Sequence, residues 1–88
     1  MNGAIKAIIA YMLNRKVIGA KHTQEEKLIK SKTKWLNKEE LRVFRKQYKK
    51  LLGNQLILRL KKRTGKGSDW HISLNPRKLR ESYEMILK

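Results

Sequence analysis

The sequence predicts an α+β fold in which a three-helix core is followed by a two-stranded antiparallel hairpin and a C-terminal helix. Apolar residues recur at helical spacing in four segments, and at a spacing of two in a pair of segments that flank a glycine-containing turn. The 88 residues, 40% of them hydrophobic, suffice for one compact core but not for two. We therefore expect a single domain over residues 1–88.

The first helix is expected from Gly3 to about Asn14. Its core face carries apolar side chains at i, i+3, i+4, i+7 and i+8, namely Ile5, Ile8, Ile9, Met12 and Leu13. The opposite side is also weakly polar, because it holds small or aromatic residues and a single lysine: Ala4, Ala7, Ala10, Tyr11 and Lys6. Such a helix should be covered on two sides, by the rest of the domain or by a second copy of the chain. A homodimer through this helix (Ala4, Ala7, Tyr11) or through the C-terminal helix is therefore left open.

The next segments give weaker local signals. Residues 17–20 contain a β-branched pair followed by a glycine, which is typical of a short edge strand or of a turn. Thr23 and Glu26 have the spacing of a capping box, so a second helix is expected from there to about Ser31. Trp35 is interpreted as an apolar anchor of the turn that follows.

A third helix is expected from Lys38 to Leu52, with Asn37 as its N-cap and Gly53 as a left-handed stop. Its core face is predicted to hold Leu41, Phe44, Tyr48, Leu51 and Leu52. About 120° away lies a row of cations with no carboxylate among them, formed by Lys38, Arg42, Arg45, Lys46 and Lys49. A solvated helix face usually mixes charges of both signs, so this row indicates a surface that contacts phosphates.

The hairpin is predicted from two stretches with a period of two, residues 55–62 and 70–74. The connection 63–69 holds two glycines and two cations, and Trp70 is interpreted as a core residue. Asn75 followed by Pro76 predicts the start of the last helix. That helix should turn four apolar residues toward the core, which are Leu79, Tyr83, Ile86 and Leu87.

The charge balance points to a polyanionic partner. Lys and Arg number 23 against 7 acidic residues, so the chain cannot neutralise itself and carries a formal charge of +16. Nucleic acid is favoured over an anionic membrane, because cations gain free energy by releasing condensed counterions and no apolar run approaches the ~20 residues of a spanning helix. With no cysteine and no secretory signal pattern, we expect a cytoplasmic protein that does not bind a membrane.

This order of elements resembles the winged helix-turn-helix superfamily of DNA-binding domains over nearly the whole chain. Residues 18–23 and 73–76 are also similar to segments of archaeal winged helix proteins. The resemblance implies that helix 38–52 enters the major groove of double-stranded DNA and that the wing, residues 63–69, lies on the backbone. The expected DNA-binding residues are Lys34, Lys38, Arg42, Arg45, Lys46, Lys49, Arg63 and Lys66. Two features depart from the family: the link between the second and third helices is long, and the first strand is barely visible.

The sequence does not favour an enzyme, a cofactor or a metal site. His22 and His71 are far apart, no cysteine accompanies them, and Asp69 is the single aspartate. The glutamates near helix starts, Glu25, Glu26, Glu39 and Glu40, are interpreted as capping and helix-dipole residues. Non-enzymatic duplex DNA binding, with a role in transcription regulation, is thus the expected function. The alternatives are a ribosome-associated RNA-binding module and a protein-interaction domain in a replication or transcription assembly.

Overall fold

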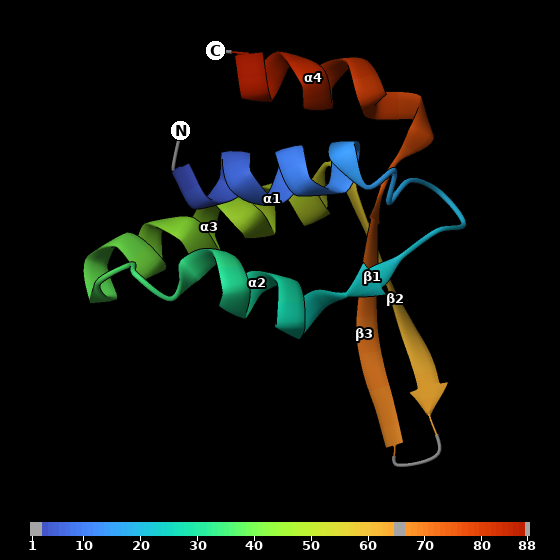
Figure 1. The fold of residues 1–88 in the computed structure, drawn as a ribbon, viewed down its shortest axis with the longest axis horizontal. Helices are drawn as coiled ribbons and strands as arrows, with labels where there is room; N and C mark the ends of the chain where they lie inside the picture. The colour runs from blue at the N-terminus through green and yellow to red at the C-terminus, as the bar shows by residue number, and fades with distance from the viewer. Residues whose placement is uncertain (1–2, 65–66, 88) are drawn as a thin grey trace.

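The computed structural model describes residues 3–64 and 67–87 (Figure 1). Four α-helices and a three-stranded antiparallel sheet form this part of the chain, so the protein is α+β as expected. The elements are α1 (Gly3–Asn14), β1 (Thr23–Gln24), α2 (Glu25–Thr33), α3 (Lys38–Gly53), β2 (Ile57–Thr64), β3 (Gly67–Leu74), the 3-10 turn η1 (Pro76–Lys78) and α4 (Leu79–Leu87). The strand order in the sheet is β1-β3-β2.

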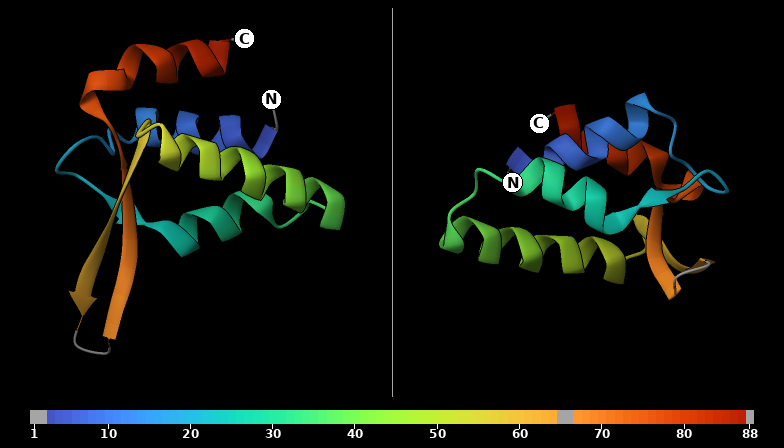
Figure 2. Two further views of the ribbon diagram at one scale, coloured as in Figure 1. Left: turned by 180° about the vertical axis from the view of Figure 1, so that it is seen from behind. Right: turned by 60° about the horizontal axis from the view of Figure 1, so that its bottom comes forward.

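Helix α1 lies at the centre of the hydrophobic core. Its predicted core face is confirmed, because Ile5, Ile8, Ile9 and Met12 are almost completely removed from solvent and Leu13 is buried. Helix α4 packs on one side of α1, while α2, α3 and β3 contact it from the others (Figures 1 and 2). The second cover that this apolar helix requires therefore comes from the same chain.

The segment between α1 and α2 agrees with the prediction at residues 17–20, where a turn was one of the two alternatives, and differs from it at Thr23. Residues 17–20 form a turn with one isolated bridge from Ile18 to Leu74, whereas the strand lies later, at Thr23 and Gln24. Thr23 pairs with Ile72 of β3, which holds its backbone in a strand. The predicted capping box at Thr23 is therefore wrong: α2 begins at Glu25, and Gln24 at the N-cap makes no side-chain capping hydrogen bond.

Helix α3 begins as predicted and ends differently. The Asn37 side chain accepts a hydrogen bond from the backbone N–H of Glu40 at 2.8 Å, and the Glu40 carboxylate accepts one from the backbone N–H of Asn37 at 3.1 Å. This capping box fixes the first turn. Gly53 is not the left-handed stop, because it is the last helical residue and the positive φ of 63° belongs to Gln55. The Asn54 side chain, which accepts from the Leu56 N–H, stabilises this later turn.

The hairpin is longer than the sequence suggested. Strand pairing runs without a break from Ile57 opposite Leu74 to Thr64 opposite Gly67. The predicted loop 63–69 is therefore mostly strand, and its Gly65 and Lys66 lie outside the described residues. A two-stranded ribbon that projects past the helices needs no apolar residues at its far end, so charged residues there are compatible with strand (Figure 2).

Helix α4 starts where predicted but turns a different face inward. The Asn75 side chain accepts from the Arg77 N–H, and the first turn after Pro76 is a 3-10 turn, which changes the phase of the helix that follows. Leu79 and Ile86 pack on the core together with Met85. Tyr83 and Leu87, predicted as core residues, are exposed, and the buried position of α4 is Ser82, directly before Tyr83.

Candidate nucleic-acid interface

A groove of about 720 Å³ separates α2, α3 and the β2–β3 hairpin. Its floor is apolar and is formed by Ile29 from α2 and by Leu41, Phe44, Tyr48 and Leu52 from α3. Charged side chains stand along its walls, with Arg45 and Lys49 on the α3 side and Arg59 beside Trp70 on the hairpin side. Three elements that are separate in sequence thus build one surface.

A partly buried ion pair fixes the three elements relative to one another. The Glu25 carboxylate, at the start of α2, accepts hydrogen bonds from the Arg59 guanidinium at 2.8 and 3.1 Å and from the Tyr48 hydroxyl at 2.7 Å. Burial raises the pKa of the Tyr48 hydroxyl well above its usual value, and the Glu25 hydrogen bond adds to the effect, so Tyr48 stays a donor. The interpretation of Glu25 as only a helix-dipole residue is therefore wrong.

Trp70 lies on the groove wall, 42% exposed, and not in the core. The Arg59 guanidinium carbon is 4.2 Å from the centre of its ring, and the Lys61 ammonium is 5.6 Å from it. Trp35, in the link between α2 and α3, is 72% exposed, with the Lys34 ammonium 5.8 Å from its ring. Both core predictions for tryptophan are wrong, because the hairpin extends beyond the helices and the link passes over the surface.

The predicted cation row on α3 is interrupted at its first turn. Arg42 donates to Glu39, with its Nη2 2.5 Å from one carboxylate oxygen and its Nε 3.3 Å from the other. The two residues are three positions apart and hence neighbours on the helix surface. Arg45 and Lys49 are different: none of the described carboxylates forms an ion pair with either. These two side chains are the part of the row that faces the groove.

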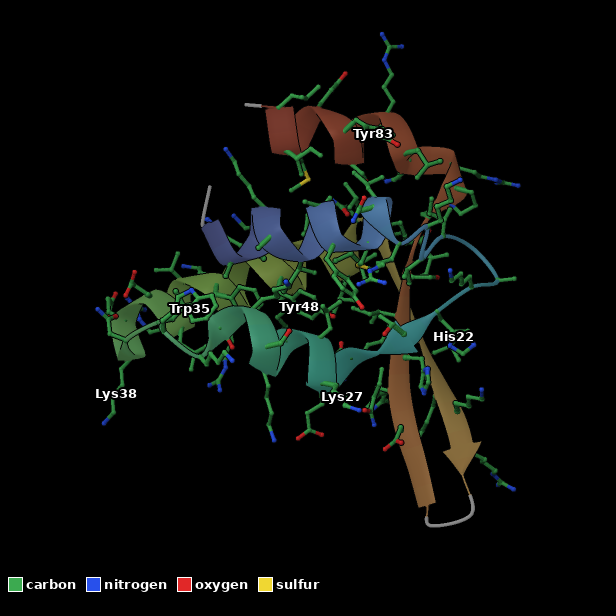
Figure 3. The ribbon with its side chains drawn as sticks, viewed as in Figure 1. His22, Lys27, Trp35, Lys38, Tyr48 and Tyr83 are labelled. Atoms are coloured by element: carbon green, nitrogen blue, oxygen red, sulfur yellow. The ribbon has the colours of Figure 1, made fainter. Side chains whose placement is uncertain are left out.

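The other predicted site residues are dispersed. Lys46 is exposed on α3 outside the groove lining. Lys38 lies at the end of α3 farthest from the hairpin (Figure 3), and Lys34 precedes it in the link. Arg63 is exposed on β2, and Lys66 lies outside the described residues.

Three residues of the site were missed from the sequence: Arg59, Lys61 and Trp70. A signal for them exists, because Arg59, Lys61 and Arg63 are spaced by two and therefore share one face of β2. Lys61 pairs directly with Trp70 across the hairpin. One face of the hairpin therefore carries cations and an aromatic ring. Arg59 on this face contacts α2 and lines the groove.

The two histidines meet on the sheet. Pairing of β1 with β3 brings the Nδ1 atoms of His22 and His71 to 2.8 Å, with the rings edge to face (Figure 3 labels His22 beside the strands). No group of three or more metal-ligating side chains occurs in residues 3–64 and 67–87. Desolvation, followed by the neighbouring His22 and Lys62, lowers the pKa of His71 below its ordinary value.

This shift predicts a loss of stability in acid. The folded state holds His71 neutral, whereas the unfolded chain takes up a proton near pH 6.5. The stabilisation is therefore complete above about pH 6.5 and declines as the pH falls toward the lowered folded pKa. Thermal unfolding between pH 8 and pH 5 should show a smaller decline for His71→Gln than for the parent chain. Equal declines would contradict the expectation.

None of the described helices combines the length and apolarity required to cross a membrane. Searches for related proteins return nothing that matches the chain, whether among family models, curated proteins or solved structures.

Proposed function

We propose that the chain is a winged helix domain that binds double-stranded DNA through α3 and the hairpin. The observation that carries the proposal is that Arg45 and Lys49 of α3, which pair with none of the described carboxylates, line a groove whose opposite wall is the β2–β3 hairpin. On that hairpin Lys61 and Arg63 share one strand face with Arg59, the β2 cation that lines the groove. The element order and the β1-β3-β2 sheet are compatible with a winged helix arrangement. In this proposal the protein binds DNA and does not catalyse a reaction. It regulates transcription in the cytoplasm of a microbial cell.

The two elements have different tasks in this proposal. Arg45 and Lys49 of α3 approach the major groove, where an arginine is able to donate two hydrogen bonds to a guanine edge. Lys61 and Arg63 of β2 contact the adjacent phosphates, which gives affinity without sequence information. Arg42 contributes less, because Glu39 already neutralises it.

Duplex DNA is preferred to duplex RNA for a geometric reason. The major groove of B-form DNA admits an α-helix, whereas the deep and narrow major groove of A-form RNA does not. Helix α3, with 16 residues and its cations on the exposed side, suits the former.

Salt dependence tests the proposal. Four cations, Arg45, Lys49, Lys61 and Arg63, each displace about 0.9 counterions from DNA, which predicts a slope of about −3.6 for log K against log salt. Fluorescence anisotropy of a labelled duplex from 50 to 200 mM salt measures this slope, with structured RNA as a competitor. Absence of duplex binding at low salt, or displacement by RNA at lower concentrations than by DNA, would contradict the proposal.

A further inference from the structure

We infer that the groove between α2, α3 and the hairpin accepts an unpaired base, so that the protein binds a duplex with a single-stranded overhang more tightly than a blunt duplex. The inference rests on the proposed function and adds to it a preference for DNA ends or junctions. The inference comes from the apolar and aromatic side chains of the groove, because a surface that binds only the DNA backbone does not require them.

The floor of the groove offers nothing to a phosphate. Phe44 and Tyr48 are stacked beneath it, with ring centres 5.7 Å apart, but they are only 1% and 8% exposed. The accessible apolar surface therefore comes from the partly exposed Leu41 and Leu52 beside them. The Tyr48 hydroxyl is committed to Glu25. A phosphate backbone would leave the exposed parts of Ile29, Leu41 and Leu52 in contact with water, whereas the flat face of a base would cover them.

The walls of the groove supply a stacking surface for the base and cations for the phosphates. Arg59 is stacked on Trp70 and held in place by Glu25, so the stack is organised before any ligand arrives. Bases stack on aromatic rings and on arginine planes with little dependence on sequence. Arg45 and Lys49 on the opposite wall are positioned for the phosphates on either side of the base. Bases within a duplex are covered by their neighbours, so the occupant must be unpaired.

Five DNA probes of one sequence test the inference on the full chain: a blunt duplex, duplexes with a short 3′ or 5′ overhang, and the two overhang duplexes with abasic sites in place of the unpaired nucleotides. One overhang polarity should bind about tenfold more tightly than the blunt duplex, the effect of stacking one base. The abasic overhang keeps every phosphate and should lose this gain.

Tryptophan variants locate the base. Trp70→Ala should bind all five probes alike, while Trp35→Ala, which removes an exposed tryptophan outside the groove lining, should keep the preference. In a Trp35→Phe chain the remaining tryptophan is Trp70, and its fluorescence should be quenched by the overhang duplex and not by its abasic form. This measurement does not depend on whether Trp70→Ala folds.

The outcomes separate the two proposals. Equal binding of blunt, overhang and abasic probes would overturn the base-binding groove and leave duplex binding intact. Failure to bind any duplex would overturn the proposed function itself. An overhang preference that survives in the abasic probe would also overturn the inference, because phosphates alone would explain it.

Discussion

Replacing Arg45 and Lys49 together by glutamate is expected to weaken duplex binding by about four-thousand-fold at 0.1 M salt. Each unit of charge that neutralises a phosphate contributes about 0.9 log units of affinity at this salt concentration, and two reversals change four units. The fold should be unaffected, because both side chains are exposed and neither forms an ion pair with the described carboxylates. Anisotropy titration and thermal unfolding measure the two effects.

The matched control is Arg77→Glu with Arg80→Glu. It makes the same change in net charge beside α4, which lies across α1 from the hairpin tip (Figure 1). Arg80 pairs with Glu84 and is almost fully exposed, so the fold should tolerate the change. We expect less than about a tenfold loss, since charges farther from DNA than a Debye length of about 10 Å are screened. If both double variants bound equally poorly, net charge would explain binding and the interface on α3 would be wrong.

Features determined within a few residues were predictable from the sequence. The apolar period of α1 and the spacing of Asn37 and Glu40 depend on contacts one turn apart, and both appear in the structure as expected. Arg45 and Lys49 were identified in the same way, because α3 is a regular helix and its exposed side follows from its buried side.

Features determined by residues distant in sequence were not predictable from the sequence. Thr23 has the local signature of a cap, but its backbone pairs with Ile72 of β3, and this long-range contact prevails. The exposure of Trp70 depends on how far the hairpin projects beyond α3, which its own alternation does not reveal. Arg59 was missed because its role depends on Glu25, and only the packing of α2 against the sheet brings the two together.

Glu25 and Glu26 show the consequence of such packing for stability. Both are glutamates in the first turn of α2, so their interactions with the helix dipole are similar and cancel in a comparison. Glu25 is 8% exposed and holds Arg59 and Tyr48, whereas the side chain of Glu26 is 75% exposed and pairs only with Lys30 among the described residues. Glu25→Ala should therefore cost about 3 kcal/mol, and Glu26→Ala less than about 1 kcal/mol.

Urea unfolding of the two variants measures the difference, which is a large part of the stability expected for so small a domain. Most of the stability lost in Glu25→Ala should come from Tyr48, because its buried hydroxyl loses its hydrogen-bond acceptor. The partly exposed Arg59 is able to bind water instead. Tyr48→Phe should consequently destabilise the Glu25→Ala chain less than it destabilises the parent, giving a coupling energy between the two positions. Equal costs for both glutamates, with no coupling to Tyr48, would mean that Glu25 acts only through the helix dipole and that the groove wall is held by other contacts.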